Sequence, residues 1–141
     1  MGSISDDFAR MGEAVAEVAR VAGRLRAPGG CPWDREQTHA SLRPFAIEEA
    51  NEVAEAIDSG DAAKLREELG DLLFQVVIHA QLAREGGRFD LADVARGLAE
   101  KLVRRHPHVF DPAGPRGLTT EQVLAQWERV KDGETRGEGK P

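Results

Sequence analysis

The spacing of its apolar residues is the feature of this sequence that most constrains its fold. Over residues 4–26, one apolar stripe recurs in steps of three or four, at Phe8, Met11, Val15, Val18, Ala22 and Leu25. Side chains at such steps share one face of an α-helix, whereas a half-buried strand alternates at every second residue. No alternating pattern of useful length occurs in the chain. The sequence therefore predicts an all-α fold.

Glycine, proline and capping residues divide the chain into predicted helices. They cover residues 4–26, 42–58, 62–85 and 91–105, with a short last helix that follows Thr119 and ends near Lys131. Ser41 is expected to cap the helix over 42–58. Gly60 should end that helix and Asp61 should cap the next one, so that the two run antiparallel. Residues 27–34 are rich in glycine and proline and are expected to form a loop.

The helices are expected to form one domain over residues 1–131, an antiparallel bundle of four main helices plus a short C-terminal helix, followed by a disordered polar tail over 132–141. The stretch LLFQVVI at residues 72–78 is too continuously apolar for a helix with one wet side. The helix over 62–85 is therefore predicted to be central and buried nearly all round. Because short neighbours cannot cover this much apolar surface, we expect a homodimer or homotetramer.

Charge and composition exclude several classes of protein. The 141 residues carry 25 acidic and 19 basic side chains, a net charge of -6. Nucleic acids and membrane surfaces are anionic, so this chain is not expected to bind either. Its one cysteine, Cys31, cannot form an internal disulfide, and no apolar run reaches the roughly 18–20 residues that span a bilayer. We expect a cytoplasmic protein.

Two acidic clusters stand within the predicted helices, EEANE at residues 48–52 and ELGD at residues 68–71. On a helix, Glu49 shares a face with Glu52, and Glu68 shares a face with Asp71. Like charges at this spacing repel by about 0.2–0.5 kcal/mol per pair, so the helices gain nothing from them. If the two helices pack side by side, the four carboxylates converge. Such a set of oxygen ligands suits Mg²⁺, with Mn²⁺ as a substitute.

The alternative for the cluster at 48–52 is an ordinary solvated helix face, to which Glu55 is expected to belong. The cluster at 68–71 favours the metal site, because it borders the most apolar stretch of the chain, where an unpaired carboxylate is costly. A di-iron site on the same scaffold requires a histidine three residues after a glutamate on each of two helices. Neither Glu52 nor Glu68 has one.

Four ordered motifs together resemble one family. They are CPWDREQTH at residues 31–39, the two acidic clusters, and RRHPHVF at residues 104–110. The combination resembles MazG, an all-α family of nucleoside triphosphate pyrophosphohydrolases, over most of the chain. The resemblance implies Mg²⁺-dependent hydrolysis of nucleoside triphosphates to monophosphate and pyrophosphate, with nucleotide-pool clearance as the role. Longer members carry two such domains in tandem. We expect this chain to hold one, with the full acidic set, and to be active.

The resemblance also implies roles for the acidic residues. Glu49, Glu52, Glu68 and Asp71 match the metal ligands of the family. Glu48 and Glu49 are the catalytic candidates, with Glu48 expected to orient or deprotonate the attacking water or to stand beside the ligands. A triphosphate carries about four negative charges, so metal ions are needed both for its approach and for its transition state.

Three basic residues, Lys64, Lys101 and Arg105, match phosphate-binding positions of the family. Lys64 lies one helical turn before Glu68, and Lys101 with Arg105 spans one turn of the helix over 91–105. The alternative is structural, because cations in the last turn of a helix are favoured by the macrodipole whatever the function.

Aromatic residues are the candidates for the nucleotide pocket. Trp127 lies in a segment that resembles the family's C-terminal closing segment, where a ring can stack on a base, or it anchors its own helix in the core. Trp33 and His39 belong to the motif at 31–39 and either form part of the pocket or pack the loop down. His79 lies inside an apolar run and is expected to be a satisfied core histidine.

Two other functions are compatible with the same residues. One is a narrow-specificity pyrophosphohydrolase that acts on dUTP, dCTP or phosphoribosyl-ATP. The other is a regulatory helical bundle that binds nucleotide, or a partner protein, without turnover.

Overall fold

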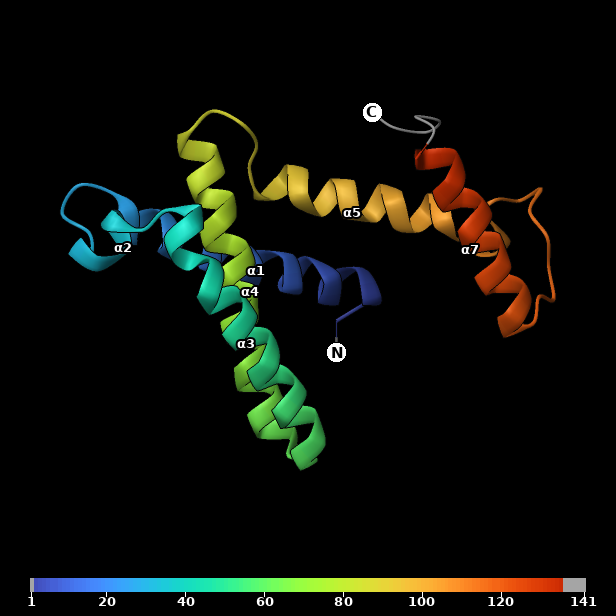
Figure 1. Ribbon diagram of the computed structural model, residues 1–141, viewed down its shortest axis with the longest axis horizontal. Helices are drawn as coiled ribbons and strands as arrows, with labels where there is room; N and C mark the ends of the chain where they lie inside the picture. Colours follow the sequence, from blue (N-terminus) through green and yellow to red (C-terminus); the bar gives the residue numbers. More distant parts are fainter. Residues whose placement is uncertain (1, 136–141) are drawn as a thin grey trace. The chain divides into compact units, whose positions relative to one another are not determined.

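The computed structural model describes residues 2–135, and its regular elements in that range are all helices, which confirms the all-α class (Figure 1). In chain order they are α1 (Ile4–Arg26), α2 (Pro32–Glu36), α3 (His39–Ser59), α4 (Ala62–Glu85), α5 (Leu91–Arg105), α6 (Pro107–Phe110) and α7 (Thr120–Thr135). The chain divides into two compact units, the first ending at Leu91 and the second beginning at Ala92. Within 2–135, no helix is long and apolar enough to cross a bilayer.

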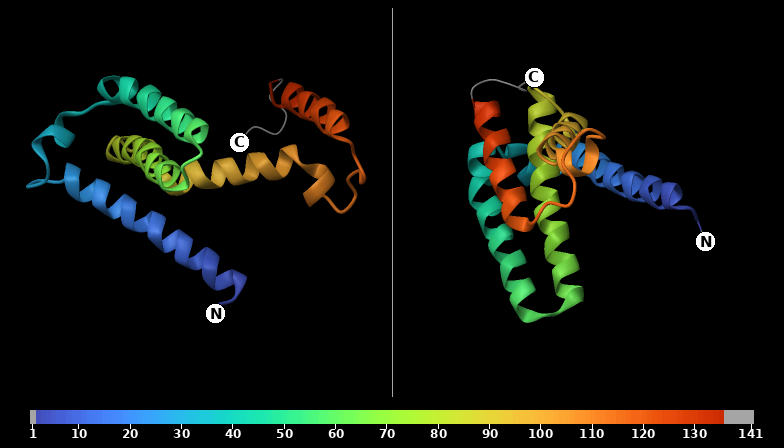
Figure 2. Two further views of the ribbon diagram at one scale, coloured as in Figure 1. Left: turned by 90° about the horizontal axis from the view of Figure 1, so that it is seen from below. Right: turned by 90° about the vertical axis from the view of Figure 1, so that its right-hand side faces the viewer.

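In the first unit, α3 and α4 lie side by side and antiparallel, as both views of Figure 2 show. Helix α1 packs on α4, and α2 packs on α1. The core residues Ala22, Leu42, Val77 and Ile78 are each at most 3% exposed and come from α1, α3 and α4. Helix α4 is therefore the common partner of the other two long helices.

The turn between α3 and α4 has the predicted capping residues. Gly60 adopts a left-handed conformation with φ of 72°, which other residues rarely adopt, and ends α3. The Asp61 carboxylate accepts hydrogen bonds from the backbone N–H groups of Ala63 at 3.0 Å and Lys64 at 3.3 Å. These caps satisfy backbone groups at both helix ends, so the hairpin is closed by local chemistry.

In the first unit, the predicted start of the helix over 42–58 and the predicted loop at 27–34 are wrong. Helix α3 begins at His39, because Thr38 caps it: the backbone N–H of Ser41 donates to Thr38 Oγ1 at 3.1 Å, and that of Thr38 donates to Ser41 Oγ at 2.8 Å. Ser41 therefore lies inside the helix, at the other end of this reciprocal capping pair. Within the predicted loop at 27–34, Pro32 opens the short helix α2, because its fixed φ suits a first helical position.

The prediction that α4 is buried nearly all round is also wrong. Val77, Ile78, Ala80 and Ala83 are buried, but Val76 is 43% exposed. Helices α1 and α3 cover the buried side of α4 and leave the other side open. The N-terminal half of α1 is exposed too, at Ile4, Phe8, Met11 and Val15.

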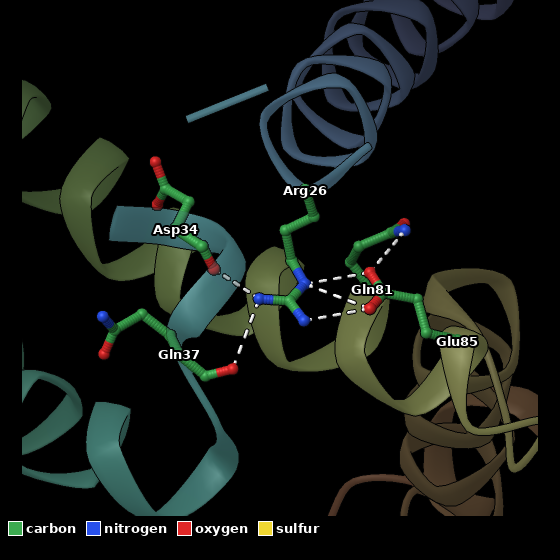
Figure 3. Close-up of polar contacts among 5 residues, drawn as sticks. All are labelled: Arg26, Asp34, Gln37, Gln81 and Glu85. Carbon is green, nitrogen blue, oxygen red and sulfur yellow. Dashed lines mark hydrogen bonds and ion pairs between the residues drawn. The ribbon is translucent and has the colours of Figure 1, made fainter. Parts of the chain in front are cut away.

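One arginine joins the end of α1 to α2 and α4 (Figure 3). Arg26 Nε donates to the two carboxylate oxygens of Glu85 at 2.9 and 3.2 Å, and Nη2 donates to Oε1 at 3.0 Å. Arg26 Nη1 donates to the backbone carbonyls of Asp34 and Gln37. Gln81 Nε2 also donates to Glu85, at 3.0 Å. The hydrogen bonds from Arg26 lower the pKa of Glu85 below its ordinary value.

The second unit contains α5 from Ala92 onward, together with α6 and α7. The predicted capping box of the last helix is present, with the Thr119 N–H donating to Gln122 Oε1 at 2.8 Å and the Gln122 N–H donating to Thr119 Oγ1 at 3.2 Å. Helix α7 continues to Thr135, four residues past the predicted end at Lys131. The rest of the predicted tail, 136–141, lies outside the described residues.

We predict that Arg26→Gln lowers the free energy of unfolding by about 1–3 kcal/mol, because it removes the guanidinium from two backbone carbonyls and leaves the Glu85 carboxylate with Gln81 as its remaining side-chain donor. The matched control is Arg20→Gln on the same helix. Arg20 pairs with Glu13, but the two side chains are 62% and 71% exposed, so its loss should cost about 1 kcal/mol or less. Urea denaturation of both variants makes the comparison, and equal losses would contradict it.

Candidate functional site

Three of the predicted metal ligands meet between α3 and α4. Glu49 on α3 and Glu68 and Asp71 on α4 each offer a carboxylate oxygen, and these oxygens all lie within 4.8 Å of one another. Glu49 and Asp71 each lie eleven residues from Gly60. An antiparallel hairpin places residues at equal distances from its turn at the same level, because both helices rise by about 1.5 Å per residue. The turn therefore sets the position of the acidic cluster.

Burial and repulsion act on the same carboxylates. Desolvation raises the pKa of Glu49 above its ordinary value, and the charges of Asp71, Glu48 and Glu52 raise it further. The pKa of Glu68 is also raised, first by desolvation and then by the charges of Asp71, Glu52 and Glu49. Each ionised carboxylate thus destabilises its neighbours, and a bound cation would remove that cost.

The fourth predicted ligand, Glu52, stands beside this group and is not one of its members. Its charge acts on both Glu49 and Glu68, and its side chain is half-buried. Glu48 is exposed and also acts on Glu49. The three grouped residues offer carboxylate oxygens alone, the donors that Mg²⁺ and Mn²⁺ prefer. The residues present therefore fit a hard divalent cation.

The three predicted phosphate-binding cations have different surroundings. Lys64 lies exposed in the first turn of α4, on the same helix as Glu68. Lys101 is half-buried on α5 and has no ion-pair partner among residues 2–135. Arg105 is engaged by Glu134 of α7, with Nη2 to Oε1 at 2.8 Å. Sequence reasoning missed Glu134, because the two residues lie 29 positions apart and no periodic pattern connects them.

His39 is paired with His79, which the sequence analysis expected to be a satisfied core histidine and for which it named no partner. Their rings stack with centroids 5.0 Å apart, and the two Nδ1 atoms lie 2.7 Å from each other. One ring must donate and the other accept, so at least one histidine of the pair is neutral. Desolvation, followed by the charge of His39, lowers the pKa of His79 below its ordinary value.

Each of the two tryptophans predicted to help form the nucleotide pocket contacts another aromatic ring. Trp33 is 51% exposed and meets Phe45 edge-on, with centroids 5.8 Å apart. Trp127 is half-buried and meets His106 edge-on at 5.3 Å. Its indole Nε1 is buried and has no hydrogen-bond partner in the part of the chain that the structure describes. Both rings are positioned by neighbours, and base stacking by either one remains a prediction.

Comparison with known proteins places the chain among MazG relatives. The model of the MazG nucleotide pyrophosphohydrolase domain family matches residues 37–110. A Thermotoga maritima nucleoside triphosphate pyrophosphohydrolase/pyrophosphatase MazG is 51% identical over 82% of this chain and 43% of its own length. An Escherichia coli K12 nucleoside triphosphate pyrophosphohydrolase is 53% identical over 79% of this chain and 42% of its own length. The chain therefore spans about two fifths of these curated relatives.

A solved structure has the same fold. The crystal structure of a mazG-related protein from Thermotoga maritima aligns with a TM-score of 0.66 and 28% identity. The alignment covers 85% of this chain and 98% of that one. The matched family region, residues 37–110, includes the acidic residues of α3 and α4.

We predict that Glu68→Gln, measured in EDTA, gives a Tm at least as high as that of the parent chain. When folding raises the pKa of a carboxyl, the protein loses stability as the pH rises from the pKa of the unfolded state through that of the folded state. At neutral pH the charge of Glu68 therefore opposes folding. Glu55→Gln, on the exposed side of α3, is the control and should leave the Tm near that of the parent. A clear drop in Tm for Glu68→Gln alone would show that repulsion is not the dominant effect.

The histidine pair predicts a pH dependence of stability. Because the pKa of His79 is lowered by folding, the unfolded chain takes up a proton near pH 6.5 while the folded chain does not. The free energy of unfolding should therefore fall as the pH drops below about 6.5. His79→Gln should flatten this slope in urea titrations between pH 7.5 and pH 5. An unchanged slope would contradict the assignment.

Proposed function

Because this chain belongs to the MazG nucleotide pyrophosphohydrolase domain family, we propose that it hydrolyses nucleoside triphosphates, NTPs and dNTPs, to nucleoside monophosphate and pyrophosphate. The observation that carries the proposal is the convergence of Glu49, Glu68 and Asp71 within 4.8 Å on the α3–α4 hairpin. The activity suits clearance of surplus or non-canonical nucleotides from the pool.

The proposed cofactor is Mg²⁺, with Mn²⁺ as a substitute. Glu49, Glu68 and Asp71 would hold it, and Glu52 stands close enough to act on their charges and to complete the set. When bound, the ion supplies charge neutralisation for the triphosphate and lowers the pKa of water. The raised pKa values of Glu49 and Glu68 support this proposal, since both carboxylates gain from a nearby cation.

The chain's own residues are proposed to divide the remaining work. Glu48 is exposed beside Glu49 and orients or deprotonates the attacking water. Lys64, Lys101 and Arg105 bind the phosphate oxygens and stabilise the pyrophosphate that leaves when the anhydride bond between the α and β phosphates breaks.

The base is proposed to stack on an aromatic ring. Trp127 is the first candidate, and Trp33 with His39 are the candidates of the N-terminal motif. Stacking is worth about 1–3 kcal/mol and discriminates little between bases, which suits a broad substrate range.

We further propose that the chain works as a homodimer or homotetramer. The support is the apolar surface that a single chain leaves open on α1 and α4, at Ile4, Phe8, Met11, Val15, Leu69 and Val76. A second copy that covered these faces would remove this surface from water.

We predict pyrophosphate release from a panel of NTPs and dNTPs in the presence of Mg²⁺. Mutating the residues that hydrogen-bond to metal ligands typically lowers metal affinity or activity by about 10–100-fold. Because Asp71 is itself a proposed ligand, Asp71→Asn should lower kcat/KM by about 100-fold or more. Glu52→Gln should also lower it. The control is Glu55→Gln, which lies on the same helix as Glu52 and is exposed.

The outcomes separate the candidate functions. Full activity of both Asp71→Asn and Glu52→Gln would exclude the proposed ligand set. A rise in Tm with nucleotide and Mg²⁺, but no pyrophosphate from any substrate, would identify a binding protein without turnover.

A further inference from the structure

The ends of α5 and α7 are joined by a cluster of two arginines and one glutamate. Arg105 Nη2 donates to Glu134 Oε1 at 2.8 Å, and Arg105 Nε donates to Oε2 at 3.4 Å. Arg104 Nε donates to the same Oε2 at 2.8 Å. The Glu134 side chain is 12% exposed, and those of Arg104 and Arg105 are 36% and 27% exposed. One carboxylate is thus held by two guanidinium groups.

This arrangement has the geometry of an anion-binding site. A guanidinium binds carboxylate and phosphate in the same way, with two parallel N–H groups directed at two oxygens. Arg105 binds Glu134 in this bidentate manner, and Arg104 adds a third donor. Lys101, one turn before Arg105 on α5, has no ion-pair partner among the described residues and adds positive charge. A phosphate group would satisfy the same donors and bring more negative charge.

The position of Glu134 is not explained by its own helix. It lies in the last turn of α7, where the macrodipole disfavours negative charge. Arg104 and Arg105, in contrast, lie in the last turn of α5, where the macrodipole favours positive charge. The hydrogen bonds from Arg105 and Arg104 lower the pKa of Glu134 to about 2, so its carboxylate stays ionised at neutral pH. The glutamate is therefore a permanent anionic ligand of the two arginines.

We propose that Glu134 is an internal competitor for the phosphate groups of the substrate, and that triphosphate binding to Arg104 and Arg105 displaces it and frees the end of α7. The inference rests on the proposed function, because that function assigns phosphate binding to Arg105. The chain then has two states, one with Glu134 on the arginines and one with phosphate on them. Before phosphate binds, only the molecules in which Glu134 has left the arginines can bind it. The apparent affinity for phosphate is therefore the intrinsic affinity multiplied by the fraction of such molecules.

The exchange couples phosphate binding to the helix that carries the proposed base-stacking residue. Trp127 lies on α7, seven residues before Glu134 and so about two turns away. When Glu134 leaves the arginines, α7 loses its ion pairs to α5. Phosphate binding thereby releases the C-terminal end of the helix whose tryptophan is proposed to meet the base.

The test is calorimetric titration of the full chain with inorganic tripolyphosphate and Mg²⁺, a probe that has no base and needs no turnover. Glu134→Gln should bind about three- to tenfold more tightly than the parent chain, because the internal competitor has lost its charge. The matched control is Glu128→Gln, which removes one charge from the same helix at a residue that pairs with Lys131 and is 72% exposed. Its Kd should equal that of the parent.

Three further measurements make the test independent of folding and of catalysis. Glu134→Asp keeps the charge but shortens its reach by one methylene, so its Kd should lie between those of the parent and Glu134→Gln. In hydrogen exchange, tripolyphosphate should speed exchange at the C-terminal end of α7 in the parent chain, where it releases the helix. Arg105→Gln should weaken binding in both the parent and the Glu134→Gln background.

Equal or weaker binding by Glu134→Gln would overturn the proposal and make Glu134 a positioning residue for Arg105. Slower exchange at the end of α7 on binding would overturn it too. If Glu134→Gln binds tripolyphosphate more tightly than the parent chain but the parent chain releases no pyrophosphate from any substrate, the proposed function is overturned and this inference stands. If the parent chain hydrolyses nucleoside triphosphates but Glu134→Gln binds tripolyphosphate no more tightly than the parent, the proposed function stands and this inference is overturned.

Discussion

The mutual repulsion of three carboxylates on one helical hairpin is the constraint around which the first unit is built. Helices α3 and α4 hold oxygens of Glu49, Glu68 and Asp71 within 4.8 Å of one another, and burial makes the charges of Glu49 and Glu68 more costly. This arrangement does not stabilise the fold by itself, because the neighbouring charges raise the pKa of Glu49 and of Glu68. A bound hard cation would convert this repulsion into binding energy, and the approach of the proposed triphosphate substrate would depend on that conversion.

The rest of this unit keeps the repelling groups in place. Gly60 and Asp61 close the turn that sets the level of the acids on the two helices. The core of Ala22, Val77 and Ile78 packs α1 against α4. Arg26 fixes the end of α1 to Glu85 at the far end of α4. Apolar packing and capping thus hold together a hairpin that its own carboxylates oppose.

Features that depend on local sequence were predictable, and features that join distant residues were not. The bounds of α1 and α4 and the caps at Gly60 and Asp61 follow from spacing and capping chemistry, and the acidic cluster follows from helical periodicity across one short turn. The start of α3 was misplaced because Thr38 and Ser41 cap each other, so either residue alone suits a helix start. The contact of Arg26 with Glu85 spans 59 positions and that of His39 with His79 spans 40, and neither leaves a periodic signal.

The most direct test of the account is calorimetric titration of the full chain with Mg²⁺ alone. The parent chain should bind the ion, and Glu49→Gln and Asp71→Asn should each lose that binding, while Glu55→Gln should keep it. At pH values near the raised pKa of Glu49 and Glu68, binding should also release protons, because the ion favours the charged carboxylates. Equal Mg²⁺ affinity in all four chains would contradict the claim that these carboxylates form the site.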